Sequence, residues 1–535
     1  MTSAAADDDD RRHRGGPVLM SPEDAAAQVR DGDVLAVGGS GGGLLEPGAL
    51  LKALGERFVR TASPHGLTLL HATGIGDRKG SGMDHLAHHG MHARVVGGNW
   101  GNAPGMCELA VAGEFEAYNF PQGVVSQMFR EVAAGRPGVI THVGLGTFCD
   151  PRRQGGRLND RTPAELVELV SLAGREWLFY KAVPPSVCFI RGTAADEDGN
   201  ISFEHEGARL ENLAIAQATR NSGGLVIAQV KRYVQRGAID PKLVLVPGIC
   251  VDIVVVVPEQ RQMDSAEFNP ALSGQTRVVL SSLDPLPFDE RKIVARRAVQ
   301  EIRDADVVNL GVGIADGVAA VAAEQGWIDR FTCTIEQGLI GGVPSRGIDF
   351  GTSTNPQAMI DAPSQFDFYD GGGIDIAFLG FAQVDRHGNV NVSKFGNKLI
   401  GLGGFANISQ NARTVVFCGT FTSGGLDARP GDGALAITQE GRHRKFVPEV
   451  EQISFAASES LKRGQRVLYV TERAVFRLTS AGLTLCEVAP GVDADADIRS
   501  LMAWELEVAA DLRPMDARIL RPDPLPDDWR SLTTQ

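Results

Sequence analysis

The sequence predicts an α/β protein built from two duplicated, doubly wound (Rossmann-like) domains, with the active site between them. At 535 residues the chain is too long for one hydrophobic core. An apolar strand that opens into glycines and then a helix occurs near the N-terminus and again after residue 305, which is the order of a doubly wound sheet. A second motif, D-x-x-G-N followed by alternating residues, is also repeated. Together these repeats indicate an internal duplication.

The first unit begins at Ser21-Pro22, where a capping hydroxyl and a first-turn proline predict a helix start. The apolar run 34–37 predicts a strand, and it opens into the glycine loop 38–43. Pro47 then predicts the start of the next helix.

The second unit repeats this order. Residues 290–302 have the apolar spacing of an amphipathic helix, and 306–310 read as a strand that runs into Gly311. The D-x-x-G-N motifs begin at Asp196 and Asp385. We therefore expect a disordered tail over 1–16, an N-terminal domain over 17–262, a linker over 263–289 and a C-terminal domain over 290–525.

Composition and charge exclude several classes of protein. An apolar content of 43% with 22% charged residues is typical of a soluble globular protein. The net charge of −14 argues against nucleic acid or an anionic membrane as a partner. Seven scattered cysteines, none in a C-x-x-C pair, indicate reduced core residues and a cytoplasmic location.

Glu336 is the strongest candidate for a catalytic residue. It follows the β-branched run 331–335 and precedes Gln337-Gly338, so we expect an exposed carboxylate at the end of a strand with bare backbone amides nearby. A carboxylate nucleophile needs such an approach path and such N–H donors. Cys333, three residues earlier, is a weaker candidate for a nucleophile.

Two other readings of the motifs are disfavoured. Neither glycine loop reads G-x-G-x-x-G, which argues against a dinucleotide-binding dehydrogenase, although a glycine loop before a helix suits a phosphate-bearing ligand. Four closely spaced histidines could suggest a metal site: His85, His88, His89 and His92. No Asp or Cys accompanies them beyond Asp84, and Gly90 interrupts any helix there, so a solvated loop is expected.

The chain resembles the family I CoA-transferases, of the fused single-chain acetate, propionate and 3-oxoacid type. The likeness extends from about residue 18 to about 513 and is carried by six stretches. These are 31–47 (the N-terminal signature), 118–123 (the P-Q-G turn), 144–148 (G-L-G-T-F), 336–338 (the E-x-G glutamate), 401–405 (the G-x-G-G loop) and 487–493 (the C-terminal signature). Two positions depart from the family pattern: Ser40 replaces a phenylalanine, and Asn99 replaces a histidine before Trp100.

The resemblance implies ping-pong transfer of CoA between a short-chain acyl-CoA and a free acid through a glutamyl-CoA thioester on Glu336. It implies that Gln122, Gly403 and Gly404 donate hydrogen bonds to the oxyanions. CoA would be bound by six residues of the second half: Gly311, Val312, Gly313, Ile314, Gly401 and Lys398. CoA is then a substrate, and no metal or other cofactor is expected.

The partners implied are acyl-CoA, a carboxylic acid and further copies of the chain in a homodimer or homotetramer. Three other functions stay open on the sequence alone. An acyl-CoA hydrolase would use the same thioester but admit water, whereas a sugar-phosphate isomerase or effector-sensing domain, or a regulatory CoA-binding protein, would not need Glu336.

Overall fold

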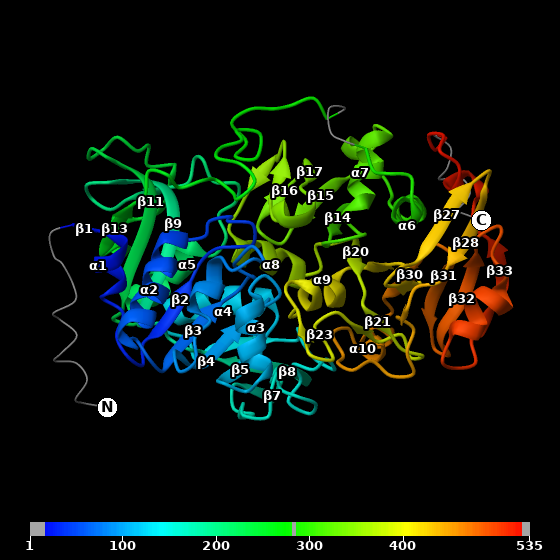
Figure 1. The fold of residues 1–535 in the computed structure, drawn as a ribbon, viewed down its shortest axis with the longest axis horizontal. Coiled ribbons are helices and arrows are strands. Elements are labelled where there is room, and N and C mark those ends of the chain that lie inside the picture. The colour runs from blue at the N-terminus through cyan, green and yellow to red at the C-terminus, as the bar shows by residue number, and fades with distance from the viewer. Residues whose placement is uncertain (1–15, 281–284, 527–535) are drawn as a thin grey trace.

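The computed structural model describes residues 16–280 and 285–526. Most of the tail expected over 1–16 therefore lies outside the described residues. Two twisted sheets stand side by side, one from each half of the chain, and helices α8 and α9 lie toward the middle of the view (Figure 1).

The path through the first sheet consists of parallel strands. Its order is β1 (Val18–Met20), β13 (Ile253–Val256), β11 (Leu225–Val234), β9 (Val187–Asp196), β2 (Val34–Val37), β3 (Leu67–His71), β4 (His92–Gly97) and β5 (Glu116–Asn119). Off this path, β10 (Ile201–Ser202) pairs with β9 and with β12 (Val244–Val246). Every residue of β9 is buried, as expected for a central strand covered on both faces.

The helices of this half are α1 (Pro22–Ala26), α2 (Gly48–Thr61), α3 (Pro104–Val111), α4 (Gln122–Ala133) and α5 (Asn212–Asn221). As predicted, Ser21 caps α1 by accepting from the amide of Asp24 at 3.1 Å, and α2 follows Pro47. A small antiparallel sheet of β6 (Gly138–Thr141), β8 (Arg175–Lys181) and β7 (Val167–Leu172) is added beside the main sheet.

The second sheet is mixed. Its order is β19 (Ala358–Met359), β16 (Leu339–Ile340), β15 (Thr332–Ile335), β14 (Val307–Leu310), β20 (Ile376–Gly380), β25 (Thr414–Cys418), β30 (Arg466–Val470), β31 (Ala474–Thr479), β32 (Gly482–Val488) and β33 (Glu507–Pro514). Its helices are α6 (Glu290–Val299), α7 (Gly317–Glu324), α8 (Ala362–Asp370), α9 (Phe405–Asn411) and α10 (Ala457–Lys462). The hairpin β23 (Lys394–Phe395) and β24 (Lys398–Leu399) leads into the glycine loop 401–404.

The two halves share one topology, as the repeats predict. The parallel order β3-β2-β9-β11-β13 in the first sheet corresponds to β15-β14-β20-β25-β30 in the second. The repeated aspartates make equivalent turns: the Oδ1 of Asp196 accepts from the amide of Asn200 at 2.9 Å, and that of Asp385 from the amide of Asn389 at 3.0 Å. The duplicated motif therefore closes the same tight turn in both halves.

One hydrophobic core extends across both halves. It includes Phe120 and Val124 of the first half and Phe366 and Phe405 of the second, all buried. The described part of the expected linker is packed rather than free, because Leu272 joins this core and the amide of Asn355 donates to Ala271 O at 3.3 Å. The shared core fixes how the halves face one another.

Asn119, at the end of β5, joins the halves through its fully buried side chain. Its Nδ2 donates to the carbonyls of Gly97 at 2.9 Å and Gly98 at 2.7 Å, and its Oδ1 accepts from the amide of Leu402 at 2.9 Å. An alanine at this position would leave the buried amide of Leu402 without its acceptor, and the carbonyls of Gly97 and Gly98 would each keep one backbone donor, from Phe120 and Gly403, but lose the second.

We expect Asn119→Ala to lower the free energy of unfolding by about 2–4 kcal/mol, since an unpaired buried amide costs about 1–3 kcal/mol and each further hydrogen bond lost costs about 0.5–1.5 kcal/mol. Urea unfolding curves measure this effect. Asn221→Ala is the control, because that exposed side chain donates only to Ala133 O and its removal should change the free energy by less than about 0.5 kcal/mol. Equal losses in the two variants would contradict the proposed importance of Asn119.

Candidate active site

Glu336 lies at the carboxyl end of β15, as predicted. The chain turns back at once into β16, with Ile335 paired to Leu339, so Glu336 and Gln337 occupy the tip of a tight reversal. Gly338 has a φ of +100°, and a Cβ there would lie 2.1 Å from the carbonyl oxygen of Ile360. Only glycine fits this turn, and the turn holds Glu336 at the edge of the sheet between the halves.

The expectation of an exposed carboxylate is wrong in one respect. Glu336 is half-buried, and its Oε2 is fully buried with no hydrogen-bond partner among the described residues. Burial raises the pKa of Glu336 to about 7. Ionising Glu336 costs free energy because its buried Oε2 accepts no hydrogen bond from a neighbouring group.

A segment of the second half, residues 400–404, lies along two loops of the first half. The amides of Trp100 and Gly101 both donate to Ile400 O at 2.8 Å. The amide of Gly403 donates to Gly98 O at 2.8 Å, and the amide of Gln122 donates to Gly403 O at 2.9 Å. These bonds bring the P-Q-G turn and the G-x-G-G loop, which lie far apart in sequence, into one site.

Of the three expected oxyanion donors, one is already hydrogen-bonded within the protein and two are not. The amide of Gly403 is already bonded to Gly98 O, which corrects its expected role. The amide of Gly404 forms no hydrogen bond within the described residues, and a Cβ at Gly404 would lie 3.3 Å from Cγ of Glu336. The Nε2 of Gln122 is also buried without a described partner. Gly404 and Gln122 are therefore free to bind an incoming oxygen.

Asn99 belongs to the same site. A Cβ at Gly403 would lie 3.4 Å from Asn99 Nδ2 and 3.8 Å from Gln122 Oε1. The sequence drew attention to Asn99 only as a departure from the family pattern. Its position beside Gln122 places a side-chain amide where the family pattern has an imidazole.

A buried polar network behind Gln122 was missed by the sequence analysis. The amide of Gly123 donates to Asn407 Oδ1 at 3.2 Å, and Asn407 Nδ2 donates to Asp370 Oδ1 at 2.9 Å. Gln127 Nε2 donates to Asp370 Oδ2 at 3.0 Å, and burial raises the pKa of Asp370 to about 7. The network holds the start of α4 against α8 and α9, and no local pattern connects residues so distant in sequence.

Four of the six residues expected to bind CoA lie at the sheet edge next to Glu336. Continuing the pairing of Asn309 with Thr334 brings Gly311 beside Glu336. Val312, Gly313 and Ile314 line a cavity of about 440 Å³. The other two expected CoA ligands are elsewhere: the amide of Gly401 donates to Ser393 O, and the exposed Lys398 lies over the ring of Phe395 in the β23–β24 hairpin.

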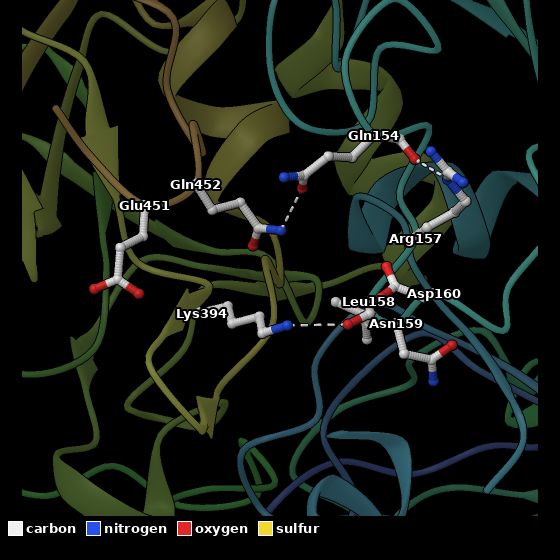
Figure 2. A pocket seen from close by; sticks show the side chains of 8 residues that line it. All are labelled: Gln154, Arg157, Leu158, Asn159, Asp160, Lys394, Glu451 and Gln452. Carbon is white, nitrogen blue, oxygen red and sulfur yellow. Dashed lines mark hydrogen bonds between the residues drawn. The ribbon is translucent and has the colours of Figure 1, made fainter. Parts of the chain in front are cut away.

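A polar cavity of about 340 Å³ lies on the other side of that hairpin, where the halves meet (Figure 2). Two hydrogen bonds cross it, from Lys394 Nζ to Leu158 O at 3.0 Å and from Gln452 Nε2 to Gln154 Oε1 at 2.7 Å (Figure 2). Its polar groups are largely engaged by protein partners, inside the cavity or, for Asn159 and Glu451, outside it, so this cavity is an interface between the halves rather than a second catalytic site.

The remaining candidates give no competing site. Cys333 is buried, and burial raises the pKa of its thiol to about 12, which removes it as a nucleophile. The histidine segment is only partly the solvated loop that was expected, because His92 is buried and its Nε2 bonds to Leu86 O. Over residues 16–280 and 285–526, no cluster of three or more His, Cys, Asp or Glu could hold a metal ion. Within the same ranges, no helix is long and apolar enough to cross a membrane.

Comparison with known proteins agrees with this geometry. The family model described as Coenzyme A transferase matches residues 19–257. Acetate CoA-transferase YdiF of Escherichia coli K12 is 46% identical over 94% of this chain and 95% of its own length. Caffeate CoA-transferase of Acetobacterium woodii is 43% identical over 96% of this chain and 98% of its own length.

Solved structures show the same likeness. Crystal structures of the E. coli O157:H7 acyl-CoA transferase YdiF, as the apoenzyme and as a thioester complex with CoA, superpose with TM-scores of 0.92 and 0.91. Each is 44% identical and is matched over 96% of this chain and 98% of its own. The fold and site define an enzyme that handles acyl-CoA. The chain belongs to the CoA-transferase family, whose members move CoA between an acyl-CoA and an acid.

We expect kcat/KM for acyl-CoA to fall as the pH is lowered through about 7. The pKa of Glu336 is raised, so this candidate nucleophile is protonated below about pH 7 and ionised above it. A pH profile of kcat/KM reports this group in the free enzyme. A profile that stays flat down to the ordinary pKa of a glutamate would contradict the raised pKa.

Proposed function

We propose that this CoA-transferase moves CoA from a short-chain acyl-CoA to a free carboxylic acid of the acetate, propionate, butyrate or 3-oxoacid class, by ping-pong catalysis through a glutamyl-CoA thioester. The observation that carries the proposal is the position of Glu336 beside Gly404, where an added Cβ would lie 3.3 Å from Glu336 Cγ; the Gly404 amide and the Nε2 of Gln122 have no partner among the described residues. The thioester complex with CoA described for YdiF supports the covalent intermediate.

In the first step, the Glu336 carboxylate attacks the carbonyl carbon of the acyl-CoA, and the C–S bond breaks to release CoA thiolate. The product is an acyl-glutamyl anhydride. The thiolate then attacks the glutamyl carbonyl, which gives the Glu336–CoA thioester and releases the first acid as its carboxylate. A second carboxylate reverses these steps, so the thioester bond is conserved and no water enters.

Each addition places negative charge on a carbonyl oxygen. Gln122 Nε2 and the amide of Gly404 are the proposed donors to that oxygen, and the loss of one such donor typically raises the barrier by about 3 kcal/mol. The Gly403 carbonyl accepts from the Gln122 amide, so Gly403 fixes the position of Gln122 instead of donating itself.

Two relatives that are 46% and 43% identical to this chain are named for different acids, acetate and caffeate. The acid that this enzyme uses is therefore identified by experiment. An acceptor screen with acetyl-CoA against short straight, branched, hydroxy and 3-oxo acids tests the proposed class. Release of CoA at the same rate without any acceptor would indicate a hydrolase. A homo-oligomeric state and a cytoplasmic location stay predictions.

We expect CoA to become covalently attached to Glu336 when the enzyme is incubated with acyl-CoA alone. Trapping with hydroxylamine or borohydride, followed by peptide mass spectrometry, locates the modified residue. Glu336→Ala should abolish both the adduct and turnover. Cys333→Ala is the matched control and should retain the adduct at Glu336, because its buried thiol takes no part in the reaction. Modification at any other residue would refute this assignment.

We expect Gln122→Ala to lower kcat and kcat/KM together by about a hundredfold or more, because the lost hydrogen bond forms mainly in the transition state. Gln122→Glu keeps the shape of the side chain but replaces the donor with an acceptor, so it should be impaired at least as much. Steady-state kinetics with acetyl-CoA measure both variants. A change confined to KM would assign Gln122 to substrate binding alone.

A further inference from the structure

A cavity of about 440 Å³ is lined by Val312, Gly313 and Ile314. It extends beyond this glycine loop to residues that the sequence analysis did not connect with CoA. It lies at the carboxyl ends of three neighbouring parallel strands, β14, β20 and β25. Its other walls are formed by the residues that follow these strands, by the start of α6 and by one lysine; they are Glu290, Arg291, Gly380, Phe381, Cys418, Gly419, Thr420, 422–426 and Lys445. In doubly wound sheets, ligands bind at this edge of the sheet.

Glycine keeps the cavity open. Gly313 has a φ of +102°, and a Cβ there would meet no atom within 4 Å, so its backbone faces free space. A Cβ at Gly419 would lie only 2.9 Å from Lys445 Nζ. The lysine ammonium is therefore held directly against the backbone that follows β25.

Among the residues that the structure describes, the side chain of Lys445 has no hydrogen-bonded or ion-paired anion. Its Nζ lies 4.3 Å from the centre of the Phe381 ring, and it forms no hydrogen bond or ion pair with any residue of the described ranges. The carboxylate of Glu472 favours the charged form of Lys445, but it is already bonded to Arg473 and to the amide of Phe421. Burial lowers the pKa of Lys445 to about 8. An unpaired, desolvated ammonium is costly, and an anionic ligand would offset that cost.

We propose that Lys445, over the ring of Phe381 and beside Gly419, binds a phosphate group of the CoA substrate. The inference rests on the proposed function, since it assigns the place of the nucleotide end of CoA relative to Glu336. Glu336 follows β15 and Gly419 follows β25, which is three strands away, about 14 Å at the usual spacing between strands. The pantetheine arm would then run from Glu336 past Gly311 to the lysine.

Two phosphate sources within CoA share this chemistry, the 5′-diphosphate and the 3′-phosphate. Comparing CoA with 3′-dephospho-CoA separates them, since only a 3′-phosphate contact is lost in the shorter compound. Lys445→Ala should weaken the binding of whichever group it contacts and leave the other contact unchanged.

The test compares acetyl-CoA with acetyl-pantetheine, which lacks all the phosphates. Lys445→Ala should lower kcat/KM for acetyl-CoA about tenfold to hundredfold, chiefly through KM, because a hydrogen bond to a charged group is lost. It should leave kcat/KM for acetyl-pantetheine unchanged. Lys445→Arg, which keeps the charge, should recover part of the loss. Lys462→Ala is the control, because that lysine is exposed and pairs only with Glu459 on α10.

Binding of ADP and of 3′,5′-ADP, measured by titration calorimetry, gives a readout that does not depend on turnover. Wild type should bind at least one of them, and Lys445→Ala should bind it at least tenfold more weakly. Equal losses with acetyl-CoA and acetyl-pantetheine would overturn the proposal, and so would a CoA-specific loss found in Lys398→Ala but absent from Lys445→Ala.

The same experiments distinguish a failure of the proposed transferase activity from a failure of the phosphate site alone. If wild type fails to transfer CoA and forms no adduct at Glu336, the proposed function itself is wrong. If wild type does both and Lys445→Ala matches it with acetyl-CoA, only the phosphate site is wrong.

Discussion

The geometry of the site depends on a short run of backbone hydrogen bonds between the halves. Residues 400–404 accept from Trp100, Gly101 and Gln122 and donate to Gly98 and Asn119, so the second half supplies an extended segment that the first half binds almost as it would a strand. Backbone bonds of this kind fix position closely and are shielded from water here. If the segment shifted, Gln122 and Gly404 would no longer lie near Glu336, although both sheets could stay intact.

The second constraint is electrostatic. The site holds a carboxyl whose buried oxygen has no partner and two donors, at Gln122 and Gly404, that are also unengaged. The folded-state pKa of Glu336 is raised. The contribution of Glu336 to stability therefore declines as the pH rises from the ordinary pKa of a glutamate through about 7. The fold tolerates this cost because the shared core and the network around Asp370 hold the surrounding helices. The unengaged donors at Gln122 and Gly404 are groups that a substrate oxygen can engage.

The elements that the sequence predicted correctly are those with local signals. Strand 34–37, the helix after Pro47 and a strand over 306–310, observed over 307–310, were predicted from apolar runs and from glycine and proline positions, because these signals are local. The exposure of Glu336 and the role of the Gly403 amide were predicted wrongly. Both depend on atoms from other segments: burial of the Glu336 Oε2 and the carbonyl of Gly98. The network of Gly123, Asn407 and Asp370 had no sequence signal at all.

The sequence by itself determined the duplication and the strand-to-glycine junctions and singled out Glu336 as the candidate nucleophile, since periodicity, turn chemistry and the E-x-G motif are properties of neighbouring residues. Only the tertiary structure decided which amides stay free, how far the pKa of Glu336 rises and where Lys445 lies. These properties depend on burial and on distances between residues far apart in the chain, and such distances are set when the two halves close on a common core.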